Sequence, residues 1–354
     1  MDFCYRFPLV KGIQAGRAYF IGMVPLNMLP KLFPNDDEYV APEHRAQRRL
    51  NENRIPEIKK YIIENKNTYV FSALAASIDG KYRFIPSNED GLGILEVDMK
   101  SKLLINDGQH RKAAILAALE EEPEIGEETI SVVFYEDRGL RRSQQMFTDL
   151  NKHAVKTSNS IAELYDSRDP LAVVTRSAIS NIAFLDEYVD KEKDNLGKFS
   201  SALFALNTFY KSNRRILGKN ECNDEFETFV TEFWNNVVVH MVPWQDVIKR
   251  ELSKKDLREQ YIATQAVIIQ AIGRVGASMY ENREEDLYNK LKGLEQINWR
   301  RNYSEWKGRV IRSDGKMLTS NEAITLAGNV IKTKLTIPLT DEEAFMEEKF
   351  KKRK

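Results

Sequence analysis

The segment KLLINDGQHRKAAILAALE, residues 102–120, decides the fold of the first half of the chain. An apolar run of strand-like composition ends at Asp107 and Gly108, and an alanine-rich stretch typical of a helix follows directly. A strand that passes through a glycine turn into a helix places backbone N–H groups and the positive end of the helix dipole at one point. The sequence therefore predicts an anion-binding position at residues 107–111.

The side chains of this turn favour phosphate as the anion. Gly108 would let the backbone approach a ligand, and Asp107 or Asn106 would cap the helix. Arg111 could make a forked contact to phosphate, His110 could donate or carry a proton, and Asp107 could instead orient a hydroxyl or hold Mg²⁺ through water. A purely structural turn is the alternative, because Asp-Gly is a common turn dipeptide. His110, one of only four histidines, favours a functional role.

A mixed strand and helix pattern surrounds this segment. The predicted elements are a hairpin over 7–24, an amphipathic helix over 43–67 that restarts at Pro56, hairpins over 68–86 and 93–106, the helix after the turn, and a strand over 129–137. From about residue 140 the pattern becomes helical, with amphipathic stretches near 171–189, 200–217, 223–240, 257–280 and 317–335. We therefore predict an α+β protein, with a mixed domain at 1–155 and a helical domain at 156–354.

The composition is that of a globular protein with no overall charge bias. The 354 residues include 53 basic and 53 acidic side chains, so DNA binding would need local cationic patches. Neither Cys4 nor Cys222 has a neighbour at metal-ligand spacing, and we expect no metal site. No apolar run approaches the length of about 18 residues needed to cross a bilayer, and the first residues lack a signal-peptide pattern. We expect a cytoplasmic protein without membrane contact.

Two cationic clusters could contact DNA phosphates. The first comprises Arg138, Arg141 and Arg142, ahead of a predicted helix. The second, residues 298–316, holds six cations and two acids, and its candidates for DNA contact are Arg300, Arg301 and Arg309. Aromatic residues interleave with the second cluster and could stack on bases, but we expect them to pack within the helical domain. These aromatic residues are Trp299, Tyr303 and Trp306.

The pentapeptide DGQHR at 107–111, preceded by an apolar strand, resembles the signature of the DGQHR-domain proteins. Within that group the chain resembles the DndB family of regulators of DNA phosphorothioation, or DNA sulfur modification. The similarity spans nearly the full length, through QRRLNENRIPEIKKYI (47–62), MFTDLNKHAVK (146–156), and WKGRV followed by LTIPLT. DGQHR-domain proteins are in turn similar to the ParB and sulfiredoxin-like fold, whose Gly-x-His-Arg turn binds nucleotide or DNA phosphate.

The resemblance implies a site and a function. Its implied nucleotide- or phosphate-binding residues are Gly108, Gln109, His110, Arg111, Gln47, Arg48 and Asn151. It implies a DNA-binding repressor of its own modification operon, modulated by ATP with Mg²⁺ at the turn, and we expect a homo-oligomer. One alternative is a nucleotide hydrolase or phosphotransferase with Asp107 and His110 as catalytic residues. Another is an interaction subunit that binds other DNA sulfur modification proteins.

Overall fold

The computed structural model describes residues 3–34, 52–136, 157–197, 200–283 and 286–353. The chain divides into two compact units, Met1–Val155 and Lys156–Lys354, and each is described by itself. The first unit combines a sheet with helices and the second is mostly helical, so the predicted α+β class is confirmed.

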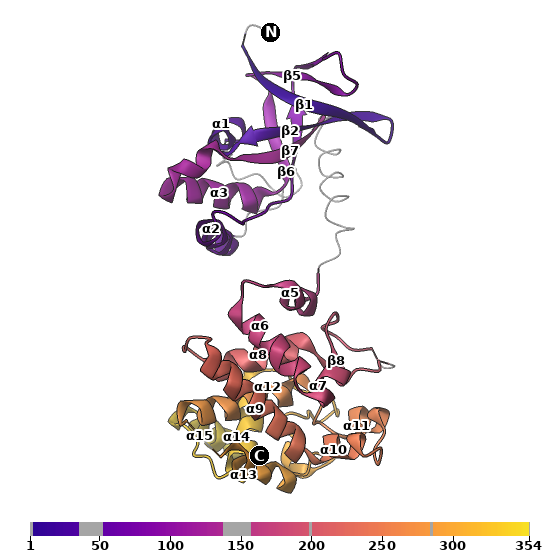
Figure 1. Ribbon diagram of the computed structural model, residues 1–354, viewed down its shortest axis with the longest axis vertical. Helices are drawn as coiled ribbons and strands as arrows, with labels where there is room; N and C mark the ends of the chain where they lie inside the picture. Colours follow the sequence, from indigo (N-terminus) through magenta and orange to yellow (C-terminus); the bar gives the residue numbers. More distant parts are fainter. Residues whose placement is uncertain (1–2, 35–51, 137–156, 198–199, 284–285, 354) are drawn as a thin grey trace. The chain divides into compact units, whose positions relative to one another are not determined.

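One sheet organises the described part of the N-terminal unit (Figure 1). Its strands are β1 (Cys4–Gln14), β2 (Arg17–Pro25), β3 (Leu74–Asp79), β4 (Tyr82–Pro86), β5 (Leu92–Asp98), β6 (Lys102–Asp107) and β7 (Thr129–Glu136). The strand order is β4-β5-β1-β2-β7-β3-β6, and only the β3–β7 pair is parallel. The hairpin predicted over 7–24 is confirmed as β1 and β2. Its turn residues Ala15 and Gly16 have φ angles of 49° and 72°, which suits a tight hairpin turn.

The two hairpins predicted over 68–86 and 93–106 are wrong. β3 pairs with β6 and β4 pairs with β5, so these four strands form one long antiparallel ribbon bent in the middle. At the bend, a Cβ on Gly80 would lie 2.4 Å from Ser101 Oγ, and that hydroxyl donates to Lys81 O at 3.0 Å. The ribbon bends at this close contact. Its β4–β5 half joins the sheet through the pairing of β5 with β1, and its β3–β6 half joins through the pairing of β3 with β7.

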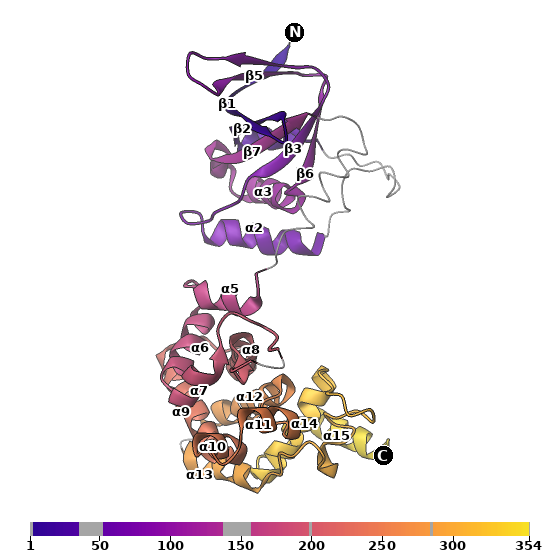
Figure 2. The same ribbon diagram turned by 90° about the vertical axis from the view of Figure 1, so that its right-hand side faces the viewer.

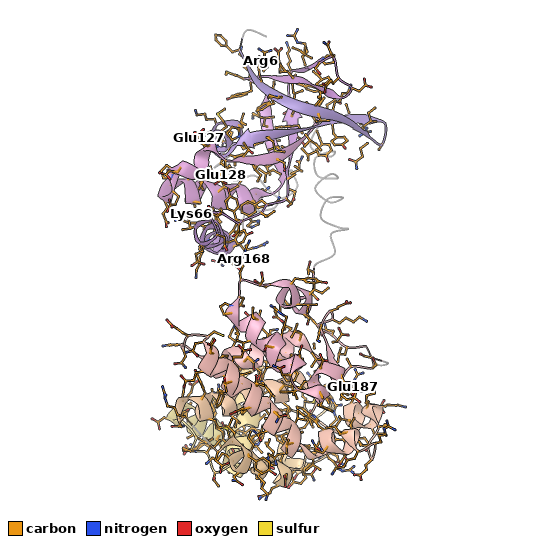
Figure 3. All side chains as sticks on the ribbon, in the orientation of Figure 1. Arg6, Lys66, Glu127, Glu128, Arg168 and Glu187 are labelled. Atoms are coloured by element: carbon orange, nitrogen blue, oxygen red, sulfur yellow. The ribbon has the colours of Figure 1, made fainter. Side chains whose placement is uncertain are left out.

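Charge pairing fixes the β4–β5–β1 side of the sheet. Glu96 on β5 is buried and stands directly opposite Arg83 of β4 and Arg6 of β1, which is labelled in Figure 3. Its carboxylate accepts from Arg83 Nη2 at 2.6 Å and pairs with Arg6 Nε at 3.4 Å. The hydrogen bond from Arg83 lowers the pKa of Glu96 despite its burial.

The helices of this unit pack on the sheet through one apolar core. They are α1 (Leu29–Leu32), α2 (Ile55–Glu64) and α3 (Gln109–Glu121), and Figures 1 and 2 both show α2 beside α3. Leu29, Ile62 and Ile115 from these helices join Val132 and Phe134 of β7 in the core. Pro56 lies in the first turn of α2, as predicted, where its missing N–H costs no helical hydrogen bond.

The C-terminal unit surrounds a second core. Its helices are α5 (Asn159–Tyr165), α6 (Pro170–Ser180), α7 (Ala183–Tyr188), α8 (Leu206–Leu217), α9 (Asp224–His240), α10 (Val242–Ile248), α11 (Lys254–Gln260), α12 (Ala266–Glu281), α13 (Leu287–Leu291), α14 (Asn321–Lys334) and α15 (Asp341–Lys352). Short strands β8 (Val189–Asp190) and β9 (Phe204–Ala205) pair in parallel. The stretch predicted as one helix over 257–280 is broken, because Ile262 N–H donates to Trp299 O at 3.0 Å and Tyr261 bridges Arg300.

Helix α15 is joined to α12 and α14 by buried ion pairs. Glu343 and Lys332 are 1% and 2% exposed, and Lys332 Nζ lies 2.8 Å from Glu343 Oε2. Arg274 of α12 donates to the same carboxylate at 2.7 Å. Burial alone would raise the pKa of Glu343, but hydrogen bonds from Lys332, the Thr340 backbone and Arg274 hold it below its ordinary value.

Candidate phosphate-binding site

Gly108 makes the turn between β6 and α3 possible. It has φ 101° and ψ 15° and occupies the N-cap position of α3, with Lys112 N–H donating to its carbonyl at 2.9 Å. An added Cβ would lie 2.3 Å from Leu74 Cδ2. Both the left-handed backbone and the packing against β3 therefore require glycine here.

The predicted capping by Asp107 or Asn106 is wrong, because Gly108 itself is the N-cap residue and both side chains make other bonds. Asp107 Oδ2 accepts from Arg111 Nη2 at 2.6 Å. Asn106 Nδ2 donates to Ser77 Oγ on β3 at 2.5 Å. The side chains on either side of the glycine thus stabilise the turn and its attachment to the sheet.

Arg111 connects the start of α3 to the segment before β3. Its Nη1 donates to Ser72 O at 2.5 Å, to Ser72 Oγ at 2.7 Å and to Ala73 O at 2.8 Å. Its side chain is 17% exposed and also pairs with Asp107. The guanidinium therefore brings positive charge to the turn, and its hydrogen bonds to Ser72, Ala73 and Asp107 hold the turn against the segment before β3. No sequence pattern indicated Ser72 or Leu74 as neighbours of the turn, because both lie more than 30 residues upstream and approach it through the β3–β6 pairing.

The first turn of α3 offers donors to an anion. The opening N–H groups of a helix have no acceptor inside it, and the dipole is positive there. Gln109, the first helical residue, has a buried Nε2 that makes no hydrogen bond to any described residue. Buried amide nitrogens are nearly always bonded in folded proteins, so this group is a candidate contact for a ligand oxygen.

Several predicted residues lie outside the residues that the structure describes. They are Gln47, Arg48, Asn151, Arg138, Arg141 and Arg142. The other members of the predicted phosphate site, Gly108 to Arg111, come together at the start of α3 because they are consecutive in the chain.

The second cationic cluster, residues 298–316, divides into buried and exposed parts. Trp299 and Trp306 are 2% and 0% exposed and stack with centroids 5.7 Å apart, so the prediction that they pack is confirmed. The same prediction is wrong for Tyr303, which is 39% exposed. Arg300 is exposed, and its guanidinium lies 5.2 Å from the ring centre of Tyr261. Arg301 is half-buried.

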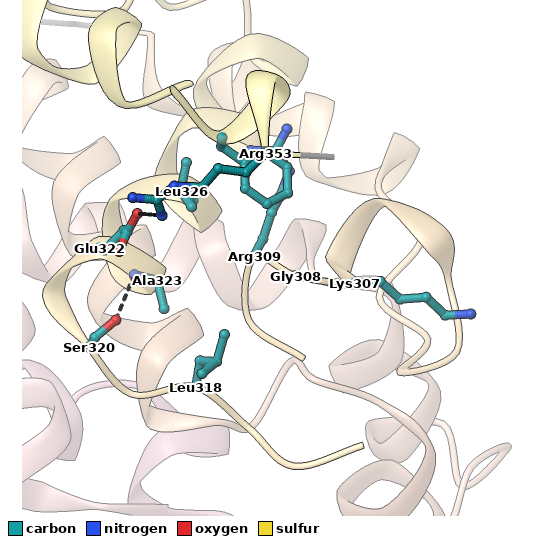
Figure 4. A pocket seen from close by; sticks show the side chains of 10 residues that line it. Lys307, Gly308, Arg309, Leu318, Ser320, Glu322, Ala323, Leu326 and Arg353 are labelled. Carbon is teal, nitrogen blue, oxygen red and sulfur yellow. Dashed lines mark hydrogen bonds and ion pairs between the residues drawn. The ribbon is translucent and has the colours of Figure 1, made fainter. Parts of the chain in front are cut away.

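Arg309 requires a correction, because it is buried rather than displayed on the surface. Its two terminal nitrogens donate to Glu347 of α15 at 2.7 and 2.6 Å, and its guanidinium lies 4.3 Å from the ring centre of Phe350. The adjoining cavity, of about 350 Å³, contains Arg353, which donates to Glu322 at 2.9 Å (Figure 4). Lys307 points away from this cavity in the same view. Carboxylates already neutralise these two arginines, so this cavity does not favour an anion.

Fold and site together define an α+β protein with a candidate anion-binding turn in its mixed unit and a helical second unit. The family model described as DndB, DNA-sulfur modification-associated, matches residues 7–338, and the chain belongs to this family. The protein is therefore associated with DNA sulfur modification. No curated protein and no solved structure matches the chain significantly. Among the described residues, no helix has the length and apolar character needed to cross a membrane.

Proposed function

We propose that the protein is a DNA-binding repressor of a DNA phosphorothioate modification operon, and that a nucleotide phosphate binds at the start of α3. Membership of the DndB family supports a role in DNA sulfur modification. The observation that carries the nucleotide proposal is the buried Gln109 Nε2 at a helix N-terminus, without an acceptor among the described residues.

In this proposal, backbone N–H groups of the first turn and Gln109 Nε2 donate to phosphate oxygens. His110 adds a donor, and Arg111 supplies charge while it remains bonded to Ser72 and Asp107. The other predicted contributors to the pocket are Gln47, Arg48 and Asn151. The described residues contain no cluster of three metal-ligating side chains. A Mg²⁺ bound with ATP would therefore take its ligands mainly from phosphates and water, with Asp107, the residue before Gly108, as a candidate carboxylate contact.

DNA contact is proposed for the predicted cations other than Arg309, because Arg309 is buried and bonded to Glu347. The proposed contacts are Arg138, Arg141, Arg142, Arg300 and Arg301. Nucleotide binding would change DNA affinity if the nucleotide binds more tightly to one of two conformations of the protein. A homo-oligomer with twofold symmetry would suit a palindromic operator.

The test is binding of the purified full-length protein to its promoter and to random DNA of equal length, with and without MgATP. Five phosphate contacts per chain predict that affinity falls about 500-fold between 50 and 200 mM salt. We expect a preference for the promoter that changes with MgATP in the wild type and not in Gln109→Ala. Equal affinity for both DNAs, or affinity that is flat with salt, would contradict repression.

A nucleotide hydrolase or phosphotransferase is the second candidate. It is favoured by Asp107, whose side chain is 43% exposed beside the proposed phosphate position. Phosphate release from ATP would be compared among the wild type, His110→Ala and Asp107→Asn. Rates that stay unchanged in both variants would remove the turn from any catalytic mechanism.

An interaction subunit would behave differently in the same variants. They would keep their binding to DNA and ATP but would no longer co-purify with other DNA sulfur modification proteins.

A further inference from the structure

A second cavity lies in the C-terminal unit, between the end of α11 and the loop that follows Trp299. Its volume is about 770 Å³, within the range of small-molecule sites. Four cations line it: Arg300, Arg301, Lys307 and Arg312. Glu259 is the one acid among the lining residues.

The charges of this cavity are poorly compensated. Within the described chain, no carboxylate forms an ion pair with Arg300, Arg301 or Lys307, whereas Arg312 Nε donates to Asp314 at 2.9 Å. Arg301 Nε is buried and has no acceptor among these residues. Cations held together without counter-charges repel one another, and an anion bound among them relieves that repulsion.

The loop that carries these cations is held in place. Arg301 N–H donates to Gln260 O at 2.7 Å, which joins the loop to the end of α11. Trp306, directly before Lys307, is fully buried, stacks on Trp299 and donates from Nε1 to Asn298 O at 2.7 Å. A site fixed in advance loses little conformational entropy when a ligand binds.

We propose that this cavity binds a nucleoside di- or triphosphate. Arg300, Arg301 and Lys307 would hold the phosphates. Glu259 would repel a ligand that is phosphate alone, but its carboxylate can accept from the hydroxyl or amino groups of a nucleoside. The site lies in a different unit from the start of α3 and goes beyond the proposed function. Arg300 and Arg301 also belong to the proposed DNA contacts, so a nucleotide here would compete with DNA for them.

The experiment measures ATP bound per chain by equilibrium dialysis of the full-length protein, without DNA. The double variant Arg301→Gln and Lys307→Gln should weaken one ATP site at least tenfold, whereas Lys249→Gln, an exposed lysine outside the cavity, should leave binding unchanged. The charge-retaining double variant Arg301→Lys and Lys307→Arg should restore binding, which separates lost charge from lost folding. ATP should bind more tightly than tripolyphosphate, and Glu259→Gln should reduce that preference.

Unchanged ATP binding in the Arg301→Gln and Lys307→Gln protein would overturn the proposal. The proposal would also be overturned if this double variant kept its ATP binding but lost affinity for random duplex DNA. The cavity would then be a site for the phosphates of the DNA backbone rather than for a nucleotide. His110→Ala distinguishes this inference from the proposed function. If only the α3 site exists, His110→Ala weakens ATP binding and the cavity variant does not; if only the cavity binds, the reverse holds.

Discussion

Gly108→Ala should destabilise the N-terminal unit much more than Gly16→Ala, although both glycines have positive φ. Gly108 has φ 101° and Gly16 has φ 72°. The two positions differ in what an added Cβ would meet. At Gly108 it would lie 2.3 Å from Leu74 Cδ2, whereas at Gly16 nothing lies within 4 Å. Gly16→Ala is therefore a matched control for the backbone cost alone.

The magnitudes follow from these two contributions. A left-handed conformation costs an ordinary L-residue about 1–2 kcal/mol, which applies to both variants. Forcing a methyl group into a packed site adds about 1–3 kcal/mol, which applies only at Gly108, because Leu74 is fully buried and has little room to move. We expect a loss of about 2–5 kcal/mol for Gly108→Ala and about 1–2 kcal/mol for Gly16→Ala.

The assay is urea unfolding of the full-length protein followed by circular dichroism, with hydrogen exchange of peptides from β3 and β6 to assign the loss to the N-terminal unit. Gly108→Ala should speed exchange in both strands, since Leu74 and the turn lie on them. Equal destabilisation by the two variants would refute the reasoning, because it would show that the Leu74 contact costs nothing.

Three further outcomes are expected. Lys332→Met should cost about 3 kcal/mol in denaturant unfolding, because Glu343 keeps its buried charge and loses one of its two cationic partners while Arg274 remains; a loss below 1 kcal/mol would contradict this. Arg309→Gln should destabilise the protein by about 1–3 kcal/mol yet leave DNA affinity within about twofold, and a large affinity loss in a folded variant would restore its DNA role. Burial raises the pKa of Glu163 from 4.5 to about 7. Between pH 4.5 and about 7 the Glu163 carboxyl is therefore protonated in the folded state but ionised in the unfolded state. The free energy of unfolding should fall as pH rises from about 4.5 through about 7. Glu163→Gln should remove that fall and gain about 1–2 kcal/mol at pH 8, as thermal unfolding at pH 5 and 8 would show.

Local patterns predicted most elements of the fold. The β1–β2 hairpin, the restart of a helix at Pro56 and the helix after Gly108 follow from turn residues and apolar spacing within about 20 residues. Strand pairing over 68–107 was predicted wrongly, because adjacent strands with an Asp-Gly link favour a hairpin. The actual pairing depends on the corner at Gly80 and Ser101, a contact that sequence spacing does not reveal.

The backbone of the turn was predicted correctly, but its side-chain contacts were not. The turn at 107–111 and the start of α3 lie where the sequence placed them. Apart from Asp107, the partners of Arg111 could not be predicted, since they are Ser72 and Ala73 in the segment before β3, 39 and 38 residues away. Arg309 shows the same limitation. The cations near it in the sequence indicated that Arg309 lies on the surface. In the structure it is buried in an ion pair with Glu347 of α15, a helix that was not predicted.

The four tryptophans of the chain all lie in the C-terminal unit, at positions 234, 244, 299 and 306. Tryptophan fluorescence, excited selectively at long wavelength, therefore reports on that unit alone, and nearly full burial gives all four a blue-shifted emission in the folded state. The stacked pair Trp299 and Trp306 immediately precedes the cations of the second cavity. A ligand in that cavity should perturb this emission, whereas a ligand at the start of α3 should be spectroscopically silent. The unlabelled protein thus carries its own optical means of telling the two sites apart.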